Sequence, residues 1–188
     1  MLLSRFTLAL PLLALAGTGL HAQGKFHHYS NSLAPYVVSP QGIVDRMLEI
    51  ADLKPNETLY DLGSGDGRIV ITAAQRFRAK AVGVEISDTL VRSTNDKILK
   101  LGLQNRASII HQDMMQVDLS PADVVTIYLM TGSNEILRPN LEKYLKPGAR
   151  VVSHEYVIPG WKPKLIEKPD QDDVHGHIIY LYAVPPKK

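Results

Sequence analysis

The sequence predicts an α/β protein built on a doubly wound, mostly parallel sheet of seven strands. Segments with strand and helix patterns alternate five times, a glycine-rich turn follows the first buried strand, and two further strand-like segments close the chain. Alternation of this kind is typical of parallel strands joined by crossover helices. Too few residues separate Trp161 from Lys164 for a helix before the sixth strand, which leaves one face of the sheet thinly covered there. The last two strands look like an antiparallel pair.

Hydrophobic periodicity and turn residues place each element. Apolar side chains recur at helical spacing from Ile43 to Ala51, whereas residues 123–129 are almost wholly apolar, as in a parallel strand covered on both faces. Ser87 is a good N-cap for a long helix that we expect to end at Gly102. We expect helices from residue 39 or 40 to about 51 and at residues 68–77, 88–102 and 134–145, and strands at residues 58–62, 81–86, 107–111, 123–129, 150–157, 164–167 and 177–184.

Composition restricts the classes of function. With 188 residues and 45% hydrophobic content, the chain is long enough for one ordinary domain with its own core. It has no cysteine, which excludes a thiol nucleophile, a zinc–thiolate site and disulfides. The formal net charge is +2, with no long run of basic residues. This charge gives a nucleic-acid partner no electrostatic support, so we expect none. We expect a monomer.

The N-terminus has the layout of a secretory signal peptide. Arg5 precedes an apolar run from Phe6 to about Ala16, and small residues end at Ala22, after which we expect cleavage. The apolar run is short for a membrane span and contains Pro11, so a membrane anchor is the weaker alternative, and a transit peptide is weaker still. We expect residues 1–22 to be this signal, 23–40 an extended segment and 41–188 the functional domain, exported or periplasmic.

The stretch LYDLGSGDGR, residues 59–68, carries the main functional signal. A strand breaks into a turn with glycine at positions 63, 65 and 67 and then opens a helix, so that backbone amides point into a cleft at the carboxyl edge of the sheet. The spacing GxGxG differs from the GxGxxG of dinucleotide binders, and no phosphate-loop motif follows. Asp61 and Asp66 would repel a pyrophosphate and attract an ammonium group. S-adenosylmethionine is the candidate cofactor.

Two later strand ends add acidic groups to the same edge. Glu85 closes the second strand, where a carboxylate can accept hydrogen bonds from ribose hydroxyls. Asp113 follows the third strand and is placed to accept from an adenine amine, with Met114 packing on the ring. The alternatives are that Glu85 only caps the next helix and that Asp113 and Met114 are solvated loop residues.

At this point the chain resembles the class I S-adenosylmethionine-dependent methyltransferases, and most closely the ATP synthase c-subunit and adenine nucleotide translocase lysine N-methyltransferases. The shared stretches are PYVVSP, LYDLGSGDGRIVITAA, AVGVEIS, DLSPADVVTIYL and LRPNLEKYLKPGARVVSHEYVIPGW, which cover most of residues 35–161. The resemblance implies the strand order 3-2-1-4-5-7-6 and a protein lysine as the methyl acceptor.

The resemblance also assigns roles to residues. It implies that the first strand's end and its turn hold the methionine part of the cofactor, that Glu85 holds the ribose and Asp113 the adenine edge, and that two residues before the first helix close over the cofactor. Tyr128 would lie near the methyl acceptor. The full set of expected cofactor-binding residues is Tyr36, Ser39, Asp61, Gly63, Ser64, Gly65, Asp66, Gly67, Glu85, Asp113 and Met114.

Methyl transfer to lysine requires alignment of nucleophile, methyl group and sulfur, exclusion of water, and a neutral amine. Tyr128 is the first candidate for orienting the amine, although it equally fits a buried sheet residue. His154 and Glu155, at the end of the fifth strand, are candidate proton acceptors, with a structural role the simpler reading for His154. A small-molecule acceptor and a non-catalytic cofactor-binding protein are the alternative functions. A nicotinamide dehydrogenase is disfavoured by the glycine spacing.

The C-terminal region offers a weaker candidate site. Asp170, Asp172, Asp173, His175 and His177 include common metal ligands. An acidic hairpin turn exposed to water explains the same residues, so the sequence predicts no metal.

Overall fold

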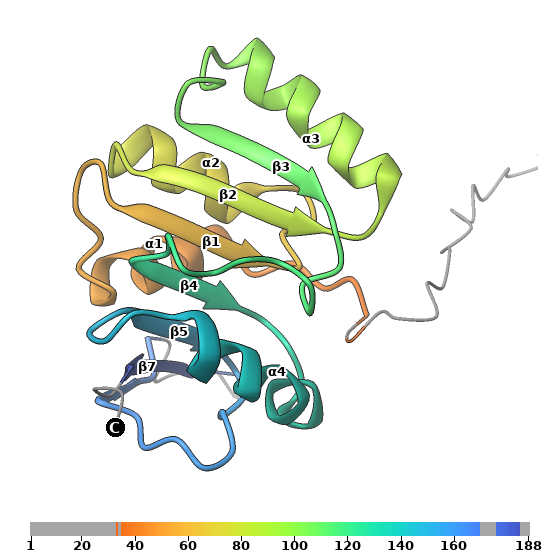
Figure 1. Ribbon diagram of the computed structural model, residues 1–188. Helices are drawn as coiled ribbons and strands as arrows, with labels where there is room; N and C mark the ends of the chain where they lie inside the picture. The colour runs from red at the N-terminus through yellow and green to blue at the C-terminus, as the bar shows by residue number, and fades with distance from the viewer. Residues whose placement is uncertain (1–32, 34, 170–175, 185–188) are drawn as a thin grey trace, which may run out of the picture.

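The computed structural model describes residues 33, 35–169 and 176–184, and its strands form one sheet of seven (Figure 1). The sheet order is β3-β2-β1-β4-β5-β7-β6, which confirms the predicted order and fold class. The helices are α1 (Gln41–Ile50), α2 (Arg68–Arg76), α3 (Asp88–Lys100) and α4 (Thr131–Tyr144). The strands are β1 (Thr58–Leu62), β2 (Lys80–Glu85), β3 (Ala107–His111), β4 (Val124–Ile127), β5 (Arg150–His154), β6 (Leu165–Glu167) and β7 (Ile179–Ala183).

The proposed signal peptide lies outside the described residues. Within the described ranges, we find no helix with the length and apolar character that a membrane crossing requires.

Two hydrophobic cores lie on opposite faces of the sheet. Apolar residues of α1, α2 and α3 pack on one face, against side chains such as Leu59 and Val152. On the other face, α4 and the segment around Leu119 cover Leu62 and Ile127. β4 is buried at all four positions, as predicted for a parallel strand covered on both sides.

Parallel pairing brings four strand ends to one edge of the sheet. Leu62, the last residue of β1, pairs with Val84 of β2 and with Ile127 of β4, and Ile127 pairs in turn with Ser153 of β5. Only β7 runs antiparallel to β5, and β6 pairs antiparallel with β7. The residues that follow β1, β2, β4 and β5 are therefore neighbours, which is where open α/β sheets bind their ligands.

Several predicted boundaries were wrong by one to three residues. β4 ends at Ile127 instead of residue 129, and β5 ends at His154 instead of residue 157 because Glu155 has a left-handed backbone with φ of 67°. α4 begins at Thr131, three residues before the predicted start. Thr, Gly and Ser at its first positions are weak helix formers, but tertiary contacts override their propensity. Ser133 is buried, and its hydroxyl donates to the carbonyl of Leu33.

The close packing of β2 against its neighbours gives a test of the fold. A Cβ atom on Gly83 would overlap Ile109 and the side chain of Ser64. We expect Gly83→Ala to lower the free energy of unfolding by about 1–3 kcal/mol. Gly42→Ala is the matched control, because a Cβ there meets nothing within 4 Å and the site is helical. Gly42→Ala should raise the free energy of unfolding by about 0.5–1 kcal/mol. Urea denaturation measures this free energy for both variants, and equal effects would contradict the close packing around Gly83.

Candidate active site

The glycine turn after β1 is fixed to the end of β2. Gly63, Gly65 and Gly67 have φ of 80°, 54° and 71°, the left-handed region that glycine adopts without strain. The amides of Gly63 and Ser64 donate to the carbonyl of Val84 at 2.8 and 3.1 Å. A Cβ on Gly67 would overlap the methyl group of Thr94 from α3. The predicted turn is therefore present, and its position is set by β2 and α3.

Asp61 is a buried carboxylate without a cation. Its residue is only 4% exposed, and its Oδ1 accepts a hydrogen bond from Thr126 Oγ1 of β4 at 2.8 Å. Among the described residues, no lysine, arginine or histidine forms an ion pair with it. Burial raises the pKa of Asp61 to about 7, the charges of Glu85 and Asp66 add to the rise, and the Thr126 hydrogen bond opposes it. A buried charge of this kind calls for a cationic partner.

Asp66 has a partner within the protein. The guanidinium of Arg68 donates to it through Nε at 2.9 Å and Nη2 at 2.7 Å, and this pairing lowers the pKa of the Asp66 carboxyl. Arg68 Nη1 also donates to the carbonyl of Ser39 at 2.7 Å. Arg68 thus ties the turn to the segment before α1. No role was predicted for Arg68, although an acidic and a basic residue on either side of one glycine, in the stretch DGR, were the available signal.

Glu85 is both a local cap and a free acceptor. Its Oε2 accepts from the amide of Gly65 at 2.8 Å, and its Oε1 accepts from the amides of Ile86 and Ser87, both at 2.9 Å. A carboxylate has about four acceptor positions, so Oε2 retains one. Capping therefore accounts for the three hydrogen bonds that Glu85 accepts within the protein, and one acceptor position on Oε2 is left for a ligand hydroxyl.

Side chains from two other segments lie on the turn. The ring of Tyr36 is 2.7 Å from where a Cβ on Gly65 would be, and Met114 Cε is 3.5 Å from the corresponding point on Gly63. A Cβ at Gly65 would overlap the Tyr36 ring, whereas the distance at Gly63 is an ordinary van der Waals contact. Asp113 Oδ1 accepts from the amide of Met115 at 2.9 Å, which folds the loop locally.

The hydroxyl of Ser64 points toward β2. Its Oγ is buried against Gly83 of β2 and has no hydrogen-bond partner in the described part of the chain. Any contact of Ser64 with a ligand above the turn would therefore come from its backbone.

Tyr128 and His154 meet at the ends of β4 and β5. Their ring centroids are 4.1 Å apart at an interplanar angle of 42°, and Tyr156 stacks on Tyr128 at 6.3 Å. His154 Nδ1 lies 2.8 Å from Ser39 Oγ. Burial first, then the charge of His177, lowers the pKa of His154 to about 4, so this ring is neutral near pH 7 and a weak base. Burial raises the pKa of the Tyr128 hydroxyl, as does the nearby Glu155.

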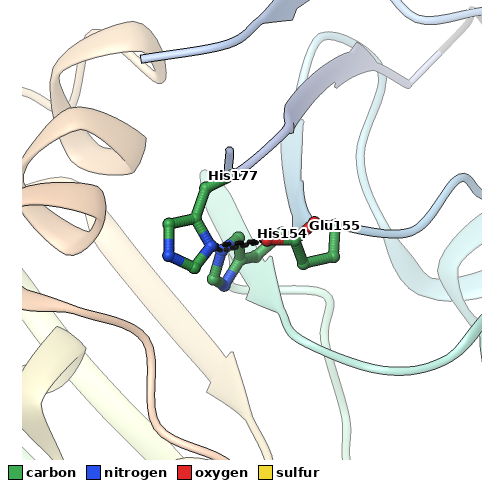
Figure 2. A group of neighbouring side chains, drawn as sticks. All are labelled: His154, Glu155 and His177. Atoms are coloured by element: carbon green, nitrogen blue, oxygen red, sulfur yellow. Dashed lines mark hydrogen bonds and ion pairs between the residues drawn. The ribbon is translucent and has the colours of Figure 1, made fainter. Parts of the chain in front are cut away.

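The sequence analysis missed one contact of this group. His177 Nδ1 lies 3.0 Å from His154 Nε2 and 2.5 Å from Glu155 Oε1 (Figure 2). His177 had been grouped with Asp170, Asp172, Asp173 and His175, which lie outside the described residues. Only the pairing of β5 with β7 brings it to His154.

The sheet order and the acid-flanked glycine turn define a methyltransferase of the class I architecture. The family model described as "ANTKMT methyltransferase domain" matches residues 61–165, more than half of the chain. A protein-lysine N-methyltransferase of Saccharolobus islandicus is 51% identical over 151 residues, which cover 80% of this chain and 93% of that protein. The mouse adenine nucleotide translocase lysine N-methyltransferase is 31% identical over 147 residues, 76% of this chain and 64% of the relative.

A solved structure supports the same class of protein. The crystal structure of an RNA methyltransferase from Salinibacter ruber in complex with S-adenosyl-L-homocysteine superposes with a TM-score of 0.75 and 39% identity, over 81% of this chain and 96% of that one. The chain belongs to the ANTKMT methyltransferase family. The predicted S-adenosylmethionine-dependent methyltransferase is confirmed at this level, whereas the roles of the individual site residues stay predictions.

The buried charge of Asp61 should cost stability in the unliganded protein. Its folded pKa of about 7 lies above the ordinary value of 3.8, so the folded state holds the proton more tightly and loses stability as pH rises between these values. Asp61→Asn keeps an acceptor for Thr126 and removes the charge. We expect it to raise the free energy of unfolding at about pH 8 by up to about 4 kcal/mol, and to have no such effect near about pH 4.

Asp66→Asn is the control variant, for which we expect the opposite change in stability. The pKa of Asp66 is lowered by Arg68, so its charge stabilises the fold above the ordinary carboxyl pKa, and the variant should be less stable than the parent at about pH 8. Urea denaturation across this pH range measures both variants. A destabilised Asp61→Asn protein at high pH would show that another group neutralises Asp61.

Proposed function

We propose that the protein transfers a methyl group from S-adenosylmethionine to the ε-amine of a protein lysine. The observation that carries this proposal is Asp61, a buried carboxylate with no cationic partner in the described part of the chain, beside the glycine turn. The ammonium group of the cofactor supplies the missing positive charge. The relatives named as lysine methyltransferases support the choice of acceptor.

The residues fit the cofactor part by part. Asp61 would hold the ammonium group, and the free acceptor position on Glu85 Oε2 would take a ribose hydroxyl. Tyr36 and Met114, which lie against Gly65 and Gly63 of the turn, would enclose the ligand between them. When bound, S-adenosylmethionine supplies an electrophilic methyl on a sulfonium. The turn's part in the reaction is to fix this ligand in one orientation.

The acceptor side must deliver a neutral amine. Lysine has a pKa of about 10.4 in water, so removal of the amine from water is needed to favour the uncharged form. Tyr128 and Tyr156 offer a wall next to His154 that would exclude water. Because His154 is a weak base, the wall would act mainly by excluding water and orienting the amine through the Tyr128 hydroxyl. The proton would then leave to solvent before transfer.

The acceptor defines the main test. Incubation of a cell extract with the full chain and methyl-tritiated S-adenosylmethionine should give label that is released by protease and recovered as methyl-lysine by mass spectrometry. Chemical blocking of the extract's lysines should abolish the signal. Label in RNase-sensitive material, for which the neighbour called an RNA methyltransferase gives a precedent, or in small molecules would overturn the lysine assignment.

Two variants separate cofactor binding from transfer. Asp61→Asn should weaken S-adenosylmethionine binding by about 1–3 kcal/mol in calorimetry, since a charge-assisted hydrogen bond is lost. Tyr128→Phe should keep that affinity and lower kcat by about tenfold to a hundredfold, since orientation is lost. Tyr144→Phe, at the far end of α4, is the matched control and should do neither. Binding without any transfer by the parent protein would favour a non-catalytic cofactor-binding protein.

We also propose that the protein is exported and that residues 1–22 are removed. The support is the order of charge, apolar run and small residues before Ala22. N-terminal sequencing of protein from fractionated cells should give Gln23 as the first residue. An intact Met1 in the cytosolic fraction would refute export, and an intact Met1 in membranes would favour the anchor.

A further inference from the structure

We propose that His154, Glu155 and His177 form a binding site for one divalent transition metal of the zinc type. The three donor atoms, two imidazole nitrogens and a carboxylate oxygen, lie within 4.8 Å of one another, where β5 ends and just before β7 begins (Figure 2). Two histidines and a carboxylate are a ligand set that zinc enzymes use, with a fourth position left for water. No ion is present in the structure.

The donor atoms lie somewhat closer together than a zinc ion requires. His154 Nε2 lies 3.0 Å from His177 Nδ1 and 3.2 Å from Glu155 Oε1, and the third side of the triangle is 2.5 Å. Zinc bonds of about 2.0–2.2 Å in tetrahedral geometry place ligand atoms about 3.3–3.6 Å apart. The triangle therefore has to widen, by up to about 0.6 Å on the first two sides and by about 1 Å on the third. Its two partly exposed members, His177 and Glu155, are the ones free to move.

The backbone brings together His154, the last residue of β5, and Glu155, which follows it. Consecutive side chains of a strand point to opposite faces, so His154 and Glu155 would normally be separated by the sheet. The left-handed conformation of Glu155, with φ of 67°, ends the strand and places its carboxylate beside the His154 ring. Such a backbone is uncommon for a glutamate and costs about 1–3 kcal/mol.

The fully buried ligand is already oriented. His154 Nδ1 contacts the hydroxyl of Ser39 at 2.8 Å, which leaves Nε2 as the nitrogen that faces the other two ligands. Histidines that bind metals usually have their second nitrogen fixed in this way.

An entry path lies next to the site. A groove of about 590 Å³ borders His177 and is lined on its other side by α1. The acidic side chains of that wall, Asp45 and Glu49, are paired with arginines, so the groove offers access for an ion and not a net negative charge.

The site also touches the proposed acceptor region, because the His154 ring contacts Tyr128. A dication there would favour the neutral form of an amine bound beside Tyr128, an effect that rests on the proposed function. Metal binding itself does not depend on it, so the two proposals can fail separately.

The test uses the full, tag-free chain after removal of metals with a chelator. Calorimetry should show one Zn²⁺ per chain. Co²⁺ should give the visible absorption of a tetrahedral cobalt site. His177→Ala and Glu155→Gln should each weaken Zn²⁺ binding at least about tenfold. His111→Ala removes an exposed histidine at the end of β3 and should bind as the parent does.

Either of two results would overturn the proposal. The first is a parent protein that binds Zn²⁺ no more tightly than His177→Ala and Glu155→Gln. The second is bound Co²⁺ that lacks the tetrahedral spectrum. Glu155→Gln changes neither size nor burial, so it keeps the test valid if His177→Ala fails to fold, which circular dichroism checks.

Discussion

The unpaired negative charge at the end of β1 is the constraint on which this site depends. Placing Asp61 in the interior is unfavourable unless a cation joins it, and among the described side chains the Thr126 hydroxyl is the partner that the fold supplies. The carboxylate needs a rigid surround, because a mobile loop would let it reach water. β2 and α3 provide this by holding the glycine turn through Val84 and Thr94. The unliganded fold thus gives up stability so that a cationic ligand regains it.

The segment before α1 connects the two halves of the site through Ser39. Its carbonyl accepts from Arg68 at the glycine turn, and its hydroxyl contacts His154 on the proposed acceptor side. Tyr36, three residues earlier, lies against Gly65. A shift of this short stretch would therefore change both halves together. Arg68 is the central link, because it also holds Asp66 in place.

The sequence was sufficient for the fold and for the turn, but not for the contacts that distinguish the roles of its residues. The alternating strand and helix patterns predict the order of the elements, and the glycines predict the position of the turn, because both reflect local geometry. The pairing of Asp61 with Thr126 and the meeting of His154 with His177 come from strand neighbours that are distant in sequence. No propensity predicts a left-handed Glu155, so the end of β5 was placed three residues late. Asp66, expected at the cofactor, also pairs with Arg68 in the described fold, a contact for which the sequence analysis gave no expectation.

The outer rim of the sheet has a consequence for self-association. β6 is an edge strand of three residues, and its Leu165 and Ile166 are exposed. Exposed apolar edges invite strands from other molecules to add on. Here Pro163 and Pro169 flank the strand, with lysines at 162, 164 and 168. Prolines lack the amide that a growing ladder requires, and the lysines repel an identical edge. Copies of the chain are thus discouraged from joining their sheets into a continuous ribbon.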